Sequence, residues 1–260
     1  MPSPPFHWPI FVVSLEIATQ RRSEIAAQLQ DAGLAFSFVD AIDGRTTLPA
    51  EWESRIDRDG AARHYGYPMS DSEFACALSH QLVYARILDE GLPGAVVLED
   101  DAILTSEFAA FYRSGGYRAA DFIQFFCFTA RIYRGPGREI LPTVRLARLA
   151  ENAFMNVGYC LSARAARHLA AASHPLRARA DWPADMTQVG ARLTVPSIIR
   201  HPPPGQSHSY IQEGREQVFP PSFDFNAGHG SRWRRIFTAT AWTRQLRRRL
   251  SRQIDPGFQA

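Results

Sequence analysis

The chain has 260 residues, of which 45% are hydrophobic and 21% charged, and its formal net charge is +3. This length and composition predict one packed domain, or one domain with a subdomain, and exclude a disordered chain. The sequence contains no lysine. It therefore excludes a P-loop NTPase, a Schiff-base lysine enzyme and a pyridoxal enzyme, because each needs that side chain.

Targeting features favour a cytoplasmic protein. No apolar run approaches the roughly 18 residues of a membrane span. A secretory signal carries basic residues before its apolar run, and the first apolar run of this chain has none before it. The three cysteines, Cys76, Cys127 and Cys160, lie far apart in apolar surroundings. We expect them to be buried free thiols.

The first predicted elements form a βαβ unit. Residues 10–16, IFVVSLE, are short, apolar and β-branched, as in a buried strand. A helical segment follows over 20–33, and a second strand over 36–41 ends at the turn Asp43-Gly44. A strand, a helix and a strand in such close succession predict a parallel sheet.

Later segments continue the alternation of strands and helices. Ser70 and Glu73 fit a capping box that opens a helix over 73–91, and the apolar strand AVVLEDD follows it. Further expected elements are strands over 121–128, 156–162 and 194–200, a hairpin around Gly135-Pro136-Gly137, and a helix capped by Ser162. This order predicts an α/β fold with a mostly parallel central sheet flanked by helices.

The AVVLEDD strand ends in three acids, Glu99, Asp100 and Asp101. Residues i and i+2 of a strand point the same way, so Glu99 and Asp101 are expected to aim at one point and Asp100 at the opposite side. Two carboxylates aimed at one point repel unless a cation lies between them, which favours Mg²⁺ or Mn²⁺ bridging a diphosphate. The alternative is that the acids are solvated or lie at the start of the next helix, and the residues alone leave both open.

Two other protein classes also end a strand in acids that bind Mg²⁺. They are receiver domains and phosphatases with an aspartate nucleophile. Both usually carry those acids on their first strand and rely on a later lysine. The late position of the acids and the missing lysine disfavour both classes here.

Three segments taken together resemble glycosyltransferase family 25, the lipooligosaccharide-biosynthesis family. They are VVSLEIATQRRSEIAAQLQDAGLAFSFVDAIDG, SEFACALSHQLVYARILDEGLPGAVVLEDDAIL, and GYCLSARAARHLAA with the following ARADW. The middle segment is the most specific, because it matches a C-x-L-S-H helix running into V-x-E-D-D. The order and spacing of the segments also match, over residues 10–210.

The resemblance implies a GT-A-like nucleotide-diphospho-sugar transferase fold in a single catalytic domain. That domain is expected over 1–230, with a nucleotide-binding part over about 8–128, an acceptor part over about 129–210, and a tail over 231–260. The implied reaction is inverting transfer of a hexose, typically galactose, from a UDP-sugar to a lipooligosaccharide or other cell-surface glycan. The alternatives are a catalytically silent, membrane-tethered glycan-binding or scaffold member of the family and a metal-dependent phosphohydrolase.

The resemblance also implies roles for residues at the strand ends. Glu99 and Asp101 are expected to hold Mn²⁺ or Mg²⁺, with Asp101 as the first ligand, to offset charge on the departing UDP. The residues expected to bind the UDP-sugar are Ser14, Leu15, Arg21, Arg22, Asp43, Ser79, His80 and Asp100. The alternatives for these positions are solvated arginines, a turn-forming Asp43 and a packed His80.

Inverting transfer needs a general base that is not a metal-bound carboxylate. Asp181 is the expected base and Asp185 the reserve, while Trp182 is a candidate to stack on a sugar face. Arg-Ala replaces the Pro-Val that the family carries before this Asp-Trp pair. His201 and His208 are expected to be exposed loop residues, with a role at the metal or the diphosphate as the alternative.

The C-terminal part of the chain has a distinct composition. The Pro, Gly, Ser and His content of residues 202–231 favours a linker. Residues 231–252 then hold eight arginines and no acid, and Trp233, Phe237 and Trp242 lie among them. Such a segment is predicted to bind an anionic membrane surface, here the inner face of the cytoplasmic membrane. A solvated helix is the alternative, and binding to nucleic acid is disfavoured.

Overall fold

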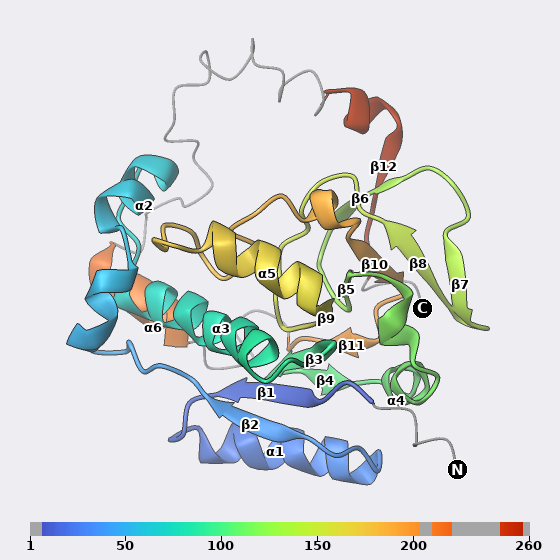
Figure 1. Cartoon of the computed structure of the whole chain (residues 1–260), viewed down its shortest axis with the longest axis horizontal. Helices are drawn as coiled ribbons and strands as arrows, with labels where there is room; N and C mark the ends of the chain where they lie inside the picture. The colour runs from blue at the N-terminus through green and yellow to red at the C-terminus, as the bar shows by residue number, and fades with distance from the viewer. Residues whose placement is uncertain (1–6, 203–209, 220–244, 257–260) are drawn as a thin grey trace.

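A mixed sheet of eight strands forms the centre of the protein, whose computed structural model describes residues 7–202, 210–219 and 245–256 (Figure 1). The strands are β1 (Ile10–Ser14), β2 (Ser37–Asp40), β3 (Gly94–Glu99), β5 (Phe122–Gln124), β7 (Arg138–Leu141), β8 (Val144–Arg148), β9 (Gly158–Ser162) and β10 (Arg192–Val195). Their order in the sheet is β2-β1-β3-β9-β5-β10-β8-β7. Two further pairs are β4 (Ile103–Leu104) with β11 (Ile199–Arg200), and β6 (Ala130–Tyr133) with β12 (Ser251–Ile254).

Most strands of the central sheet run in one direction. β1 pairs in parallel with β2 and β3, and β10 pairs in parallel with β5. β8 and β9 run antiparallel to their neighbours. The predicted α/β class with a mostly parallel central sheet is confirmed. The parallel pairing of β1 with β2 and β3 brings the carboxyl ends of these three strands to one edge of the sheet.

Helices cover both faces of this sheet (Figure 1). The α-helices are α1 (Thr19–Asp31), α2 (Arg58–Tyr65), α3 (Asp71–Asp89), α4 (Ser106–Arg113), α5 (Ala163–Ala172) and α6 (Tyr210–Val218). Shorter 3-10 helices are η1 (Ala50–Arg55), η2 (Gly116–Ala119) and η3 (Met186–Val189). On one face α1 and α4 pack their apolar sides against Val12 and Leu98, and on the other face α3 and α5 pack against Phe11 and Val97.

The predicted capping box fixes the start of α3. Ser70 Oγ accepts from the Glu73 backbone N–H at 3.3 Å, and Glu73 Oε2 accepts from the Ser70 N–H at 3.0 Å. The other carboxylate oxygen of Glu73 forms ion pairs with Arg179 at 2.7 Å and with Arg215 at 2.8 Å. This buried glutamate therefore joins α3 to the segment before Asp181 and to α6.

Two predicted strand features differ in the structure. The hairpin turn lies at Pro142-Thr143 between β7 and β8, not at Gly135-Pro136-Gly137, because β6 pairs instead with the distant β12. The strand expected over 194–200 is divided into β10 and β11. Pro196 stands between them, and its missing N–H cannot continue the ladder.

Part of the predicted tail belongs to the domain. β12 pairs antiparallel with β6, and Arg247 lies 3.1 Å from the Asp185 carboxylate. The aromatic stripe of the predicted membrane segment, with Trp233, Phe237 and Trp242, lies outside the described residues. Within the described part of the chain, no helix has the length and hydropathy needed to cross a membrane.

Candidate active site

A pocket opens at the carboxyl ends of β1 and β3, where α/β sheets usually bind ligands. We call it the β1–β3 pocket. The loop after β2, the first turns of α3 and the start of α6 complete its wall. Its polar and charged lining residues are Ser14, Arg21, Arg45, Ser72, Ser79, His80, Glu99, Asp100, Asp101 and Tyr210, together with the thiol of Cys76.

One part of the pocket, the Arg21 side, consists of Ser14, Arg21, Asp100 and Asp101. Arg21 Nη2 forms an ion pair with Asp100 and another with Asp101, the latter at 2.8 Å. Ser14 Oγ donates to Asp100 Oδ2 at 2.6 Å. β3 ends at Glu99, so Asp100 and Asp101 lie in a turn, and the expectation that Asp100 faces away from Asp101 is wrong.

The two aspartates titrate differently. Burial raises the pKa of Asp100 to about 6, although the Arg21 charge and the Ser14 hydroxyl oppose the shift. Burial also disfavours the Asp101 carboxylate, but the hydrogen bond with His201 and the Arg21 charge outweigh it and lower the pKa of Asp101. His201 Nε2 lies 3.5 Å from Asp101 Oδ2, so this histidine is a site residue rather than the exposed loop residue expected.

Asp101 retains one carboxylate oxygen for a ligand. Its Oδ1 is buried and has no hydrogen-bond partner among the described residues. A buried carboxylate oxygen without a donor is costly, and a cation would satisfy it. The residues present therefore fit a divalent cation at Asp101, while Glu99 has one oxygen, Oε1, committed to His80.

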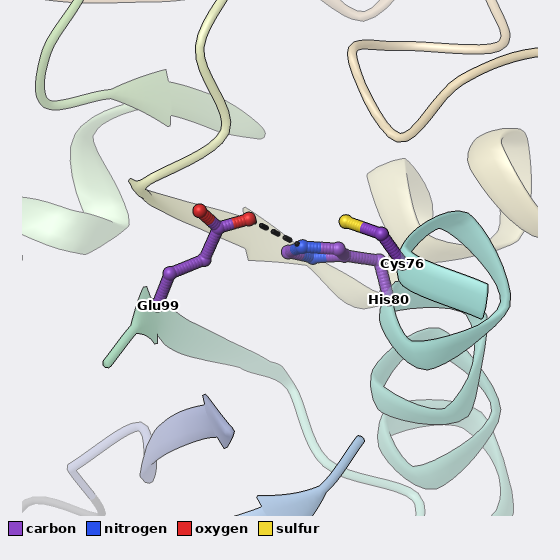
Figure 2. A group of neighbouring side chains, drawn as sticks. All are labelled: Cys76, His80 and Glu99. Carbon is purple, nitrogen blue, oxygen red and sulfur yellow. Dashed lines mark hydrogen bonds and ion pairs between the residues drawn. The ribbon is translucent and has the colours of Figure 1, made fainter. Parts of the chain in front are cut away.

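The second part of the pocket, the His80 side, consists of Cys76, His80 and Glu99 (Figure 2), and the Asn156 side chain lies against His80. His80 is 1% exposed, its Nε2 lies 3.0 Å from Glu99 Oε1, and the Asn156 amide lies 2.8 Å from the same nitrogen. On the other side of the ring, His80 Nδ1 lies 2.7 Å from the Tyr159 hydroxyl. Cys76, expected in the core, is partly exposed and lines the pocket.

Asp181 lies next to the His80 side. Burial raises the pKa of Asp181, the negative charge of Glu99 raises it further, and the Met155 N–H, His80 and Arg179 oppose the shift. Asp181 Oδ1 accepts from the Met155 N–H at 2.8 Å. A carboxylate with a raised pKa is a better proton acceptor, which is the property a general base needs.

Two residues that were predicted to bind the UDP-sugar, Arg22 and Ser79, connect the elements around the pocket. Arg22 donates to the carbonyls of Ser14 at 2.8 Å and Leu15 at 3.0 Å, and its guanidinium lies over the Phe38 ring. Ser79 Oγ accepts from the Ile42 N–H at 2.9 Å. Arg22 and Ser79 therefore join the ends of β1 and β2 to each other and to α3.

Asp43 lies in the loop after β2, between the lining residues Ile42 and Gly44. Its carboxylate accepts hydrogen bonds from the Arg45 guanidinium, whose Nε lies 2.9 Å from Oδ1 and whose Nη2 lies 2.8 Å from Oδ2. The hydrogen bonds with Arg45 lower the pKa of Asp43 despite partial burial. Arg45, absent from the sequence predictions, is itself one of the lining residues.

Comparison with known proteins places the chain in a family. Residues 7–187 match glycosyltransferase family 25, described as an LPS biosynthesis protein. The chain belongs to this family. The acidic end of β3 in an α/β sheet agrees with the GT-A-like fold that the family resemblance implies.

Individual relatives of this family 25 chain match over a shorter stretch. It is 38% identical over 96 residues to the lacto-N-neotetraose biosynthesis glycosyltransferase LgtE of Neisseria meningitidis serogroup B (strain ATCC BAA-335 / MC58). It is 36% identical over 94 residues to LgtB of Neisseria gonorrhoeae. Each match covers 36% of this chain and only 32% of the relative, so the similarity spans about a third of these proteins.

Two further similarities are to a family 25 protein that is named as inactive and to a solved structure. The chain is 32% identical over 103 residues to the inactive glycosyltransferase 25 family member 3 of Mus musculus, covering 38% of this chain and 17% of that protein. Among solved structures, mannose-1-phosphate geranyltransferase from Thermus thermophilus has a TM-score of 0.31 and 10% identity, over 75% of both chains. A structural likeness this weak supports no argument about function.

Two predicted site residues have structural roles in this family 25 chain. Trp182 is 5% exposed, donates from Nε1 to the Ala153 carbonyl at 2.6 Å and packs against Phe122 and Tyr159, so the prediction that it stacks on a sugar is wrong. Asp185 accepts from Thr187 at the start of η3 and pairs with Arg247. The carboxylate of the reserve base is therefore engaged by Thr187 and Arg247.

The sequence predictions missed α6. Tyr210 lines the pocket, and its ring centroid lies 5.6 Å from the guanidinium carbons of both Arg21 and Arg45. Gly214 allows α6 to approach α3, because a Cβ there would lie 2.4 Å from Ser72 Oγ. The polar helical stretch over 210–218 is a usable signal, but the composition around it favours a linker. His208 lies outside the described residues.

Proposed function

We propose that this chain is an inverting, metal-dependent hexosyltransferase that moves galactose from UDP-galactose to a lipooligosaccharide or other cell-surface glycan. The observation that supports the proposal is the pairing of two features in one family 25 site. Asp101 keeps a buried oxygen without a partner among the described residues in the β1–β3 pocket, and Asp181, next to the His80 side of that pocket, carries a raised pKa.

The proposed UDP-sugar site is the β1–β3 pocket. The nucleotide would lie at the ends of β1 and β2, near Arg21 and Arg45, with Tyr210 of α6 over it. Asp101, with Glu99 directly or through water, would hold Mn²⁺ or Mg²⁺, which supplies positive charge for the departing diphosphate. Arginine and ordered backbone donors suit the phosphate and the uracil.

In the proposed reaction, Asp181 accepts the proton of the acceptor hydroxyl. The hydroxyl oxygen then bonds to the anomeric carbon from the face opposite the diphosphate, the bond between that carbon and the phosphate oxygen breaks, and UDP leaves with both electrons. The buried setting that raises the pKa of Asp181 makes it the stronger base of the two candidates. The Met155 N–H fixes the position of its carboxylate.

The acceptor surface that we propose lies beside Asp181. Phe154 is 67% exposed and Phe128 is 37% exposed, so both rings are available to a ligand. The buried amide of Gln124 donates to the carbonyls of Phe126, Phe154 and Met155 and so holds both loops in place. Exposed aromatic rings on fixed loops suit stacking against a sugar ring.

A direct test is a transfer assay of the purified chain with UDP-galactose, Mn²⁺ and a galactose-accepting oligosaccharide. The proposal requires UDP release that depends on Mn²⁺ and a product one hexose longer. The second candidate, a catalytically silent member, is supported by the relative named as inactive and requires UDP-sugar binding with no product. Phosphate release from simple esters with no transfer would favour a phosphohydrolase.

We also propose that residues 231–252 attach the enzyme to an anionic membrane. Eight arginines among apolar and aromatic residues support this proposal, since each basic residue near an anionic surface contributes about 1 kcal/mol. Flotation with liposomes containing anionic lipid should retain the full chain and lose a chain without residues 231–244, which leaves β12 intact. Equal flotation of both forms would contradict the proposal.

A further inference from the structure

Three groups with metal-binding chemistry meet on the His80 side. Cys76 and His80 lie one turn apart in α3, and Glu99 ends β3 (Figure 2). The Cys76 sulfur, a His80 ring nitrogen and a Glu99 carboxylate oxygen all lie within 4.8 Å of one another. The proposed transfer reaction has no use for the thiol, so this cluster is not explained by it.

The position of Cys76 distinguishes it from the other cysteines. Cys127 and Cys160 are buried in the core, whereas Cys76 is partly exposed and lines the β1–β3 pocket with His80 and Glu99. A cation that entered the pocket from solvent could therefore reach all three groups. Their backbone comes from a helix and a strand, which hold ligands more rigidly than loops do.

The histidine is oriented as a metal ligand would be. Its Nε2 faces Glu99, and its Nδ1 lies 2.7 Å from the buried hydroxyl of Tyr159. Metal-binding histidines usually have the second ring nitrogen fixed by such a partner, which sets the tautomer and the ring plane. With the proton on Nδ1 directed to Tyr159, Nε2 accepts from the Asn156 amide, and a bound cation would take the place of that hydrogen bond.

The local charge also favours a cation. On the Arg21 side, an arginine compensates Asp100 and Asp101, whereas the carboxylate of Glu99 is paired with His80. The negative charges of Glu99, Asp181 and Asp101 act together on Cys76, and such a field attracts a divalent cation.

We propose that Cys76, His80 and Glu99 form a site for a thiophilic divalent cation of the Zn²⁺ class. Sulfur, imidazole and carboxylate are the ligand set that Zn²⁺ prefers, whereas Mn²⁺ and Mg²⁺ prefer oxygen ligands such as Asp101. Three protein ligands leave a fourth position open toward the pocket. Binding displaces the thiol proton to solvent, so the cation and the thiolate form together. The site shares Glu99 with the cation proposed at Asp101, whereas Cys76 and His80 belong to it alone.

The test uses Co²⁺ as a spectroscopic probe of the full-length protein after treatment with a chelator. Thiolate bound to Co²⁺ gives a charge-transfer absorption that carboxylate and imidazole ligands do not give. We expect this absorption in the wild type, its loss in Cys76→Ser, and its retention in the matched control Cys127→Ser. We also expect its retention in Asp101→Asn, because Asp101 is not a member of the Cys76–His80–Glu99 cluster.

Two further variants protect the test against misfolding. His80→Gln and Glu99→Gln should each weaken Co²⁺ binding more than about tenfold. Loss of a residue that only supports a ligand already weakens metal binding by about tenfold or more, and loss of the ligand itself should cost at least as much. Far-UV circular dichroism establishes that each variant is folded. Absence of the thiolate absorption in the wild type, or its persistence in folded Cys76→Ser, would overturn the proposal, as would its loss in folded Asp101→Asn.

Discussion

The Arg21 side and the His80 side of the pocket hold their carboxylates in different ways. Asp100 and Asp101 share a guanidinium, and Ser14 supplies a further hydrogen bond. Glu99 and Asp181 are held by a histidine and a backbone N–H. The His201 hydrogen bond and the Arg21 charge keep Asp101 charged, whereas burial raises the affinity of Asp181 for a proton. The difference assigns charge stabilisation to the first side and proton transfer to the second.

The largest expected effect is on the Arg21 side. Asp101→Asn should lower the rate of transfer by more than about a thousandfold, because it removes the proposed metal ligand and with it several kcal/mol of leaving-group stabilisation. Initial rates with UDP-galactose and Mn²⁺ measure it, and Asp89→Asn, on the exposed end of α3, is the control. Wild-type turnover in folded Asp101→Asn would remove the metal from this side.

On the His80 side, Asp181→Asn should lower kcat by about 10²–10⁴-fold, the usual contribution of a general base. Binding of UDP-galactose should be unchanged, because this variant removes only the proton acceptor. Calorimetric titration measures the binding and a transfer assay the rate. If donor binding were lost as well, Asp181 would belong with the donor site, and the division of roles between the two sides would fail.

The acceptor surface gives a smaller effect. Phe154→Ala should raise the acceptor KM about tenfold, equivalent to about 1.4 kcal/mol, while the KM for UDP-galactose stays constant. Leu246→Ala provides the control, since Leu246 is 58% exposed and lies in the C-terminal segment. An equal change in both KM values would instead indicate a disturbed fold around Met155.

The smallest effect concerns Asp185, whose carboxylate is structural. Its hydrogen bonds to Thr187 and Arg247 outweigh burial and lower its pKa. The charge of Asp185 therefore stabilises the fold at pH values above 3.8, the pKa of this carboxyl in the unfolded chain. This contribution is lost as the pH falls through the lower pKa of the folded state. Asp185→Asn should cost about 0.5 kcal/mol at pH 7 and nothing at strongly acidic pH.

Urea unfolding of wild type and Asp185→Asn at several pH values measures this difference. Transfer by Asp185→Asn should stay close to wild type, in contrast to Asp181→Asn. A rate loss comparable to that of Asp181→Asn would mean that the wrong carboxylate has been assigned as the base.

Local patterns in the sequence account for much of the architecture. The βαβ opening, the Ser70–Glu73 capping box and the acidic end of β3 each depend on residues close together in the chain, and each is found in the structure. The family resemblance also directed attention to Asp181, which lies beside Glu99 and His80. Short-range signals of this kind can be predicted from sequence alone.

The remaining features depend on contacts between distant residues. Alternation along β3 could not predict that Asp100 and Asp101 would share Arg21, because the chain turns after Glu99. Trp182 is drawn into the core by Phe122 and Tyr159, which no local pattern reveals. The position of α6 over the pocket likewise depends on the ion pair between Arg215 of α6 and buried Glu73, which lies more than a hundred residues earlier in the chain.

The most direct test of the central claim is a thermal-shift measurement with UDP-galactose, with and without Mn²⁺. A ligand that binds only the folded state raises Tm, by an amount that corresponds to about 2.7 kcal/mol at a hundredfold excess over Kd. We expect a rise for the wild type that grows when Mn²⁺ is present, and no Mn²⁺-dependent part for Asp101→Asn. An unchanged Tm for the wild type, or the same Mn²⁺-dependent rise in Asp101→Asn, would contradict a metal-assisted UDP-sugar site at the end of β3.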